Sequence, residues 1–282
     1  MLLKLNLRTY LIVLSLLVAL AFFPRVSSAK RPDVVADVGS PLTILEVGDS
    51  IAATNQHRRR LQERLQANGV DFDFVGDNEF TAFGQAADIN HQAFSGQRIG
   101  SFLNGRAING VIERGLVDVL PIYQPDVILV LGGYNNLAQE RVGQGLSASI
   151  DEYEELVDFV FARASEDVQV LFSNVTDFDP DGRFGHQRAN VEEWNAWLAN
   201  DVALRQSEGQ EIYIVDNFSN VTLSDLGPDG LHLLESGQNI VGDNFFDALV
   251  SSGAIAVAVP EPSVLSLIYS LAILATIRRQ KV

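Results

Sequence analysis

Three side chains, Ser50, Asp229 and His232, are of the types needed to cleave an ester. A serine hydroxyl is a poor nucleophile unless a nearby base takes its proton, and His232 can be that base through Nε2. Asp229 lies three residues before His232, so within a tight turn its carboxylate could accept a hydrogen bond from Nδ1 and stabilise the imidazolium that forms. The Asp-x-x-His spacing alone is a weak signal, because Asp229 could instead cap the turn while His232 lies on the surface.

Nucleophilic attack on an ester also requires hydrogen-bond donors for the developing oxyanion. The candidate donors are the backbone N–H groups of Ser50 and Gly96 and the side-chain amide of Asn135. Glycine at position 96 leaves its N–H open to a ligand, because no side chain blocks the approach. The alternative for Gly96 and Asn135 is a purely conformational role, since glycine and asparagine are common in turns.

The hydrophobic pattern predicts the elements that must position these groups. Apolar runs and helical periodicity predict strands at 42–47, 72–75, 126–131, 168–172 and 211–215, and helices at 56–67, 150–164, 188–205 and 234–250. This alternation predicts a parallel sheet with helices on both faces. Ligands of such sheets bind beyond the carboxyl ends of the strands. Every candidate residue lies in a loop after a strand or just before the last helix, so we expect the candidates to converge on one site.

These candidates lie in four short segments of the chain. The segments are Gly48-Asp49-Ser50, Gly96, Gly133-Tyr134-Asn135-Asn136 and Asp229-Gly230-Leu231-His232. In order and spacing they resemble the four signature blocks of the SGNH (GDSL-like) hydrolases, over about residues 42–250. The resemblance implies a three-layer α/β/α, flavodoxin-like fold whose five-stranded parallel sheet has the order 2-1-3-4-5. It also implies Ser50, Asp229 and His232 as catalytic residues, an oxyanion hole formed by Ser50, Gly96 and Asn135, and hydrolysis without a metal ion or another cofactor.

Two residues depart from the pattern of this family. Asn136 stands where the family usually has Asp, directly after the candidate donor Asn135. The usual Asp is structural more than catalytic, so the change bears on the rigidity of the loop more than on activity. Tyr134 replaces a typically small residue and is expected to narrow the pocket.

Two further segments indicate a substrate class. Residues 73–76 (Asp-Phe-Val-Gly) and 91–99 (His-Gln-Ala-Phe-Ser-Gly-Gln-Arg-Ile) are similar to the acetylxylan-esterase-like members of carbohydrate esterase family 3. This resemblance implies an acetylated carbohydrate or another small ester as substrate. Two alternatives stay open: a lipase-like or thioesterase-like enzyme acting on other acyl esters, and a non-catalytic surface module that binds glycans.

Residues 1–29 have the features of a signal peptide. Lys4 and Arg8 form a basic start, residues 11–23 are apolar, and Ser27-Ser28-Ala29 offers a small-residue cleavage site. The apolar run is too short to cross a bilayer comfortably. We therefore expect export, and an uncleaved membrane anchor is the alternative.

Residues 261–282 have the features of a second targeting segment. A linker at 251–260 separates it from a hydrolase domain at 41–250. Pro260-Glu261-Pro262 precedes an apolar stretch at 264–277 and a basic end. This order resembles the PEP-CTERM sorting signal of Gram-negative bacteria. The resemblance implies an exosortase-type sorting enzyme as partner, a place at the cell surface or outside the cell, and membrane anchoring until the tail is processed. The alternative is an amphiphilic tail helix that packs on the domain.

Charge and cysteine content exclude some functions. The formal net charge is -16, and because both ends of the chain are basic, the part between them is more acidic still. Such a surface repels phosphates, so we expect no nucleic-acid partner. The chain has no cysteine, which excludes disulfides and thiolate metal sites. Residues 179–185 lack the register of a calcium loop, so no metal site is expected.

His57, His91 and both tryptophans are expected to have structural rather than catalytic roles. His57 and the arginine run at 58–60 are expected on a solvated face of the first helix, from which an arginine could still reach an acidic sugar. His91 is expected to pack in the structure. Trp194 and Trp197 are expected in the core rather than stacked on a sugar, because aromatic side chains bury large areas.

Overall fold

Five parallel strands form the centre of the fold in a computed structural model, which describes residues 40–54, 56–79, 88–108, 111–140 and 146–256. The strands are β1 (Leu42–Gly48), β2 (Phe72–Val75), β6 (Val127–Leu131), β7 (Gln169–Ser173) and β8 (Ile212–Val215). Their order in the sheet is β2-β1-β6-β7-β8, with every neighbouring pair parallel. This confirms the α/β fold and the strand order expected from the sequence.

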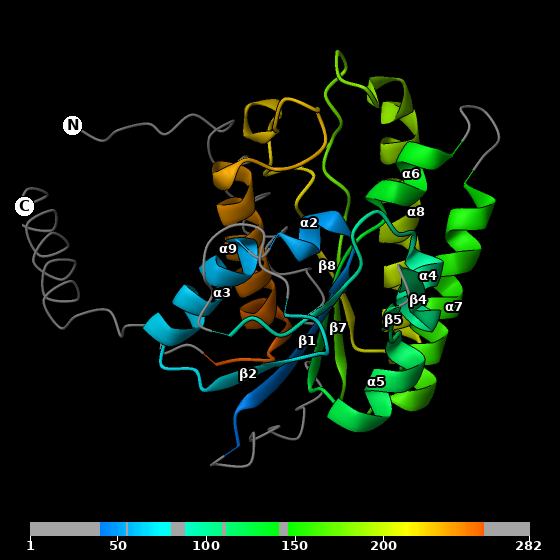
Figure 1. Cartoon of the computed structure of the whole chain (residues 1–282). Helices are drawn as coiled ribbons and strands as arrows, with labels where there is room; N and C mark the ends of the chain where they lie inside the picture. The colour runs from blue at the N-terminus through cyan, green and yellow to red at the C-terminus, as the bar shows by residue number, and fades with distance from the viewer. Residues whose placement is uncertain (1–39, 55, 80–87, 109–110, 141–145, 257–282) are drawn as a thin grey trace, which may run out of the picture. The chain divides into compact units, whose positions relative to one another are not determined.

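The central strands are continuous apolar runs because both faces of the sheet are covered. All five residues of β6 are buried, as is typical of a parallel strand between two helical layers. Figure 1 shows α3 (Gln56–Ala67) and α9 (Glu235–Ser252) beside each other on one face of the sheet. The other face carries α4 (Ile99–Asn104), α5 (Leu116–Tyr123), α7 (Ser147–Arg163) and α8 (Arg188–Ser207) (Figure 1).

One cluster of aromatic core residues lies between α7, α8 and the sheet. Trp194 of α8 is fully buried, and its ring meets Tyr153 of α7 edge to face at 6.0 Å. Trp197 also packs against this core, with its ring 5.1 Å from that of Tyr153. The prediction that both tryptophans serve core packing is confirmed.

Several short elements between residues 50 and 140 were not predicted. They are α2 (Ser50–Ala53), β3 (Gln92–Ala93), α4, the hairpin of β4 (Arg106–Ile108) and β5 (Val111–Glu113), α5, and α6 (Tyr134–Gln139). Further along the chain, the 3-10 turns η1 (Gly185–Gln187) and η2 (Leu223–Asp225) were also missed. Each is too short to show a hydrophobic period, and α5 even contains a proline, Pro121. Of these, α2 and α6 lie at the carboxyl end of the parallel strands, where the candidate residues are, whereas α5 precedes β6 and lies at the opposite end (Figure 1).

The expected signal peptide at 1–29 and the expected sorting segment at 261–282 lie outside the described residues. Among the residues that are described, no helix combines the length and the apolar character that crossing a membrane requires. The last described helix, α9, ends at Ser252, and Gly253 follows it with a φ of +80°. A left-handed glycine is a common helix stop, so the helix ends close to the boundary expected from the sequence.

Candidate active site

Ser50 begins α2 in a sharp turn at the carboxyl end of β1. Asp49 caps this helix, since its Oδ1 accepts a hydrogen bond of 3.0 Å from the N–H of Ile51. Gly48 has no room for a side chain, because an added Cβ would lie 2.1 Å from the carbonyl oxygen of Leu131 on β6. The turn that presents Ser50 is therefore fixed by a helix cap on one side and by close packing against the neighbouring strand on the other.

His232 lies within hydrogen-bonding distance of both Ser50 and Asp229. Its Nε2 is 2.9 Å from Ser50 Oγ, and its Nδ1 is 2.5 Å from Asp229 Oδ2. The second carboxylate oxygen of Asp229 accepts the backbone N–H groups of Leu231 at 3.1 Å and His232 at 3.0 Å. Asp229 thus caps its turn and also holds the imidazole, so the two interpretations left open by the sequence both describe its contacts.

The carboxylate of Asp229 is held in its ionised form. Partial burial alone would raise its pKa, but hydrogen bonds from the side chain and backbone of His232 and from the N–H of Leu231 outweigh burial, and the pKa lies below its ordinary value. At neutral pH this carboxylate therefore accepts a hydrogen bond from Nδ1–H of His232. In the tautomer that carries its proton on Nδ1, Nε2 of His232 faces the hydroxyl of Ser50 as an acceptor.

Gly96 and Asn135 follow strands that flank β1 on either side. Gly96 comes after β3, which pairs with the last two residues of β1, and it adopts a φ of +74° that favours glycine. Asn135 lies in the first turn of α6, after β6 on the opposite side of β1. The loops that carry Ser50, Gly96 and Asn135 therefore meet at one edge of the sheet, as the sequence predicted.

Asn136 is fully buried and joins two segments of the site. Its Oδ1 accepts the backbone N–H of Ile99 at 2.9 Å, and its Nδ2 donates to Oε2 of Glu152 on α7 at 2.9 Å. Tyr134 is also buried, and its hydroxyl accepts the N–H of Thr176 at 3.3 Å. Tyr134 therefore packs inside the domain, and the expectation that it narrows an open pocket is wrong.

Asp49 is a titratable group of this site that the sequence reasoning passed over. Burial raises its pKa to about 7, against the opposing effects of the Ile51 N–H, of His232 and of the backbone N–H groups of Asn135 and Tyr134. Its Oδ2 has no hydrogen-bond partner in the described part of the chain. A carboxyl beside Ser50 thus changes its charge near neutral pH.

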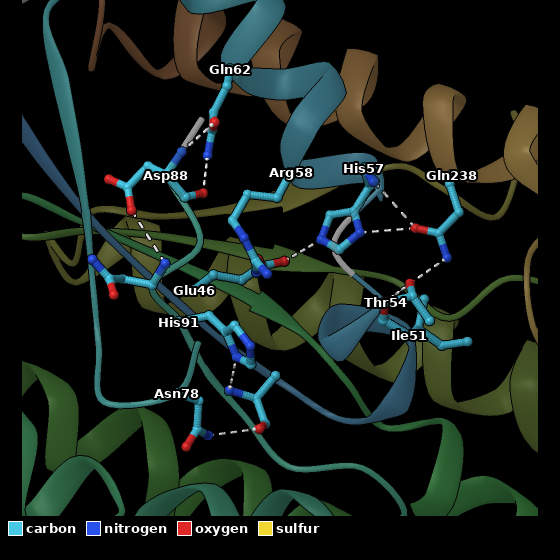
Figure 2. A network of polar contacts seen from close by, with 12 residues as sticks. Glu46, Ile51, Thr54, His57, Arg58, Gln62, Asn78, Asp88, His91 and Gln238 are labelled. Atoms are coloured by element: carbon cyan, nitrogen blue, oxygen red, sulfur yellow. Dashed lines mark hydrogen bonds and ion pairs between the residues drawn. The ribbon is translucent and has the colours of Figure 1, made fainter. Parts of the chain in front are cut away.

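A buried network of polar side chains supports the Ser50 turn from behind. Figure 2 shows Glu46 of β1 in contact with His57 and Arg58 of α3. His57 Nδ1 lies 2.9 Å from Oε1 of Gln238, which comes from α9. Gln238 in turn donates to Thr54 Oγ1 at 2.8 Å, at the end of α2. The network therefore ties the helix that begins with Ser50 to α3 and α9.

The prediction that His57 and Arg58 lie on a solvated face is wrong. Both side chains are almost completely buried, because the buried carboxylate of Glu46 on β1 requires hydrogen-bonding and charged partners within the core. Arg59 and Arg60, next in the run, do remain partly exposed. The signal that could have found the network was Glu46 itself, an acid within an otherwise apolar strand.

A pocket of about 360 Å³, whose surface is about equally polar and apolar, lies beside the segments that follow Ser50 and precede Gly96. Ala53 of α2 and Ser95, the residue before Gly96, form part of its wall. The remaining lining residues are mostly polar or charged: Asp77, Asn78, Glu79, His91, Ala93, Arg106 and Glu113. His91 is almost fully buried, and its Nδ1 accepts the N–H of Ala93 at 2.9 Å, in keeping with the packing role expected for it. Within the described residues, no group of three or more His, Asp or Glu side chains is placed to hold a metal ion.

The GDSL-like Lipase/Acylhydrolase family model matches residues 47–240. The chain belongs to this family. Membership in it makes the protein a hydrolase of ester bonds. The matched range contains all the candidate catalytic and oxyanion-hole residues. No curated protein is detectably similar to this GDSL-like hydrolase in sequence.

Solved structures of esterases share the fold of this GDSL-like hydrolase. A serine-to-alanine mutant of an acetyl esterase, solved with acetate ion, has a TM-score of 0.61 at 18% identity over 76% of this chain and 100% of its own. A carbohydrate esterase family 3 protein from Talaromyces cellulolyticus has a TM-score of 0.61 at 19% identity, with 76% and 100% covered. A family 3 carbohydrate esterase from Clostridium thermocellum has a TM-score of 0.59 at 20% identity, with 76% and 98% covered.

Proposed function

We propose that this GDSL-like hydrolase is a serine esterase that removes acetyl groups from extracellular polysaccharide. The observation that carries the proposal is the unbroken line of contacts from Ser50 Oγ to His232 Nε2, at 2.9 Å, and from His232 Nδ1 to Asp229, at 2.5 Å. It lies at the carboxyl end of β1, where open α/β sheets place their ligands. In this proposal Ser50 is the nucleophile, His232 the general base and acid, and Asp229 the group that orients His232.

The reaction proceeds in two acyl-transfer steps. Ser50 Oγ attacks the ester carbon while its proton passes to His232 Nε2, and the oxyanion accepts hydrogen bonds from the N–H groups of Ser50 and Gly96 and from the Asn135 side chain. The bond to the sugar oxygen breaks, and His232 returns the proton to that oxygen. A water molecule, deprotonated by His232, then attacks the acetyl group on Ser50, which releases acetate and restores the serine hydroxyl.

The character of the neighbouring pocket supports a carbohydrate rather than a lipid substrate. Its wall carries carboxylate, amide, imidazole and guanidinium groups beside Ala53 and Ala93. Such groups bind hydroxyl-rich rings by hydrogen bonds, whereas a long acyl chain requires apolar surface. The fold likeness to an acetyl esterase and to family 3 carbohydrate esterases points to the same substrate class.

The first test compares wild-type protein with the Ser50→Ala variant on p-nitrophenyl acetate. We expect wild type to turn over the ester and the variant to lose at least about four orders of magnitude in kcat, since removing such a nucleophile disables the whole group. Ser207→Ala, an exposed serine at the end of α8, is the matched control and should keep full activity. Full turnover by the Ser50→Ala protein would refute the role of Ser50.

The second test separates the substrate alternatives. A series of p-nitrophenyl esters from acetyl to decanoyl should show the highest kcat/KM at acetyl, and acetylated polysaccharides should release acetate. A clear optimum at long chains, or activity on thioesters alone, would reject deacetylation. If Ser50 fails to react with a fluorophosphonate probe in folded protein, the non-catalytic glycan-binding alternative replaces the esterase.

We also propose that residues 1–29 direct export and that residues 261–282 are read by an exosortase-type enzyme, which places the domain at the cell surface or outside. The support is the sequence pattern at the two ends. Mass spectrometry of protein recovered from the producing cells checks both. We expect an N-terminus just after Ala29 and loss of the basic C-terminal end. Intact termini would contradict the proposal.

A further inference from the structure

Glu152 on α7 accepts hydrogen bonds from two segments that the reaction needs to hold together. Its Oε1 accepts Arg98 Nε at 2.8 Å, and its Oε2 accepts the backbone N–H of Gly100 at 3.0 Å and Asn136 Nδ2 at 2.9 Å. The approach is close, because a Cβ added at Gly100 would lie 3.2 Å from Cγ of Glu152. One carboxylate thus holds the start of α4 and the first turn of α6.

Asn136 closes a ring with the same residues. Its Oδ1 accepts the N–H of Ile99, which lies between Arg98 and Gly100 in the chain. The candidate oxyanion donor Asn135 directly precedes Asn136, and Gly96 lies three residues before Ile99. Fixing α4 against α6 therefore fixes the spacing between these two donors.

A second set of contacts clamps the other end of α6. Arg98 Nη2 donates to Glu140 Oε1 at 3.1 Å, and the Ser149 hydroxyl donates to the same oxygen at 2.7 Å. Arg98 lies between the carboxylates of Glu140 and Glu152 and offsets part of their negative charge. The C-terminal end of α6 is thereby bound to Arg98, and its first turn is bound to the next residue, Ile99, through Asn136.

We propose that Glu152, acting through Asn136 and the backbone N–H groups at the start of α4, is a positioning residue that sets the distance between the oxyanion donors Gly96 and Asn135. This inference rests on the oxyanion hole of the proposed function. It also accounts for Asn136 in place of the usual Asp. The amide accepts from Ile99 and donates to Glu152 at any pH, whereas an ionised carboxyl there cannot donate and would face another carboxylate.

The first experiment replaces Glu152 by glutamine. A glutamine cannot accept from all three donors, because its NH₂ group must face either Arg98 Nε or the N–H of Gly100. We expect kcat for p-nitrophenyl acetate to fall by about 10- to 100-fold while KM changes by less than about 3-fold, since a displaced oxyanion donor weakens transition-state rather than substrate binding. Glu154→Gln, an exposed acid on the same helix, should leave both values unchanged.

The second experiment uses pH to separate positioning from a general loss of structure. In Asn136→Asp, two carboxyls face each other beside Arg98, with Glu140 and Ser149 on its far side, and both cannot ionise without a penalty. At low pH one shared proton restores the bond, so we expect kcat relative to wild type to fall as the pH rises. The double variant Asn136→Asp, Glu152→Gln has a single acid at this place and should lose that extra pH dependence.

The outcomes of these tests are distinguishable from failure of the proposed function. Wild-type kcat in Glu152→Gln, or a constant ratio of Asn136→Asp to wild-type kcat at every pH, overturns the positioning role. If wild-type protein hydrolyses no ester, or Ser50→Ala retains its turnover, the proposed function itself fails. Circular dichroism at each pH restricts the comparison to folded protein.

Discussion

Glu46 and Asp49 lie three residues apart at the end of β1, both fully buried, yet their pKa values are shifted in opposite directions. Burial raises the pKa of each. At Glu46 the contacts with His57 and Arg58 outweigh burial, and the pKa falls to about 2. At Asp49 the opposing groups are weaker, led by the N–H of Ile51, and the pKa stays near 7. The environment that accompanies burial, rather than burial itself, decides the charge.

The two carboxyl groups therefore have different consequences for the site. Glu46 stays ionised throughout the neutral range and anchors α3, and through Gln238 it reaches α9 and α2. Asp49 is next to the candidate nucleophile Ser50, and because its pKa is about 7, it gains or loses its charge in the neutral pH range in which an esterase works. Near the carboxyl end of β1, Glu46 thus provides a constant charge that supports the fold, and Asp49 directly after the strand places a pH-dependent charge beside Ser50.

Removing the charge of Glu46 is expected to give the largest effect on stability. Two guanidinium nitrogens of Arg58, Nε and Nη2, have no partner among the described residues, so Glu46→Gln leaves a buried cation poorly compensated. We expect a loss of about 3–5 kcal/mol in the free energy of unfolding at pH 7, measured by urea denaturation. Because the pKa of Glu46 is lowered from 4.5 to about 2, this difference should shrink as the pH falls from about 4.5 towards 2.

Glu193→Gln is the matched control for that prediction. Glu193 is exposed on α8, so its replacement should change the free energy of unfolding by less than about 0.5 kcal/mol. An equally small effect for Glu46→Gln would contradict the view that this carboxylate compensates a buried cation.

The Asp49→Asn variant is expected to gain stability relative to wild type as the pH rises, whereas Glu46→Gln loses stability relative to wild type. The pKa of Asp49 is raised from 3.8 to about 7, so between these values the folded protein binds a proton that the unfolded chain does not. Wild-type stability should therefore fall from pH 5 to pH 7, whereas Asp49→Asn lacks this loss. The free energy of unfolding of the variant minus that of wild type should increase by about 2 kcal/mol over this interval. An equal difference at both pH values would contradict a raised pKa.

The fold was predictable because the elements that build it are long and regular. The strands from Leu42, Phe72 and Val127 are mostly apolar segments bounded by turns, and they appear within a residue or so of their predicted positions. The candidate active-site residues could be located because each follows such a strand or precedes the last helix. The alternating order of the elements predicted a parallel sheet covered by helices on both faces, whereas the strand order was implied by the resemblance to the SGNH hydrolases.

The buried polar contacts could not be predicted from the sequence in the same way. The arginine run on α3 looks uniformly hydrophilic, yet Arg58 is buried while Arg59 remains partly exposed. Which residue turns inward depends on the position of Glu46, and that follows from the packing of α3 on the sheet. Glu152 likewise lies far along the chain from Arg98, and nothing in its local sequence marks it as a partner of that loop.

Gln238 links the buried network to α2, and its loss should have a moderate effect. Its Oε1 accepts from the backbone N–H of His57 at 3.3 Å and faces Nδ1 at 2.9 Å, while its Nε2 donates to Thr54. Gln238→Leu removes these hydrogen bonds and leaves the backbone N–H and Nδ1 of His57 without this acceptor, so we expect a loss of about 1–3 kcal/mol in the free energy of unfolding. Gln66→Leu, an exposed glutamine on α3, provides the control in the same denaturation experiment. A loss no larger than that of the control would mean that the network ends at His57.

The smallest effect is expected from an ion pair on the solvent side of the same helix. Glu63 approaches Arg59 at 3.7 Å and Arg60 at 3.6 Å, and its side chain is 52% exposed. Water and salt screen such a pair, so Glu63→Gln should change the free energy of unfolding by less than about 0.5 kcal/mol. Glu46 and Glu63 both contact arginines of α3, so measuring both variants at low and high salt isolates the effect of burial. A loss for Glu63→Gln comparable to that for Glu46→Gln would mean that the number of arginine contacts, and not their removal from water, determines the contribution of these carboxylates.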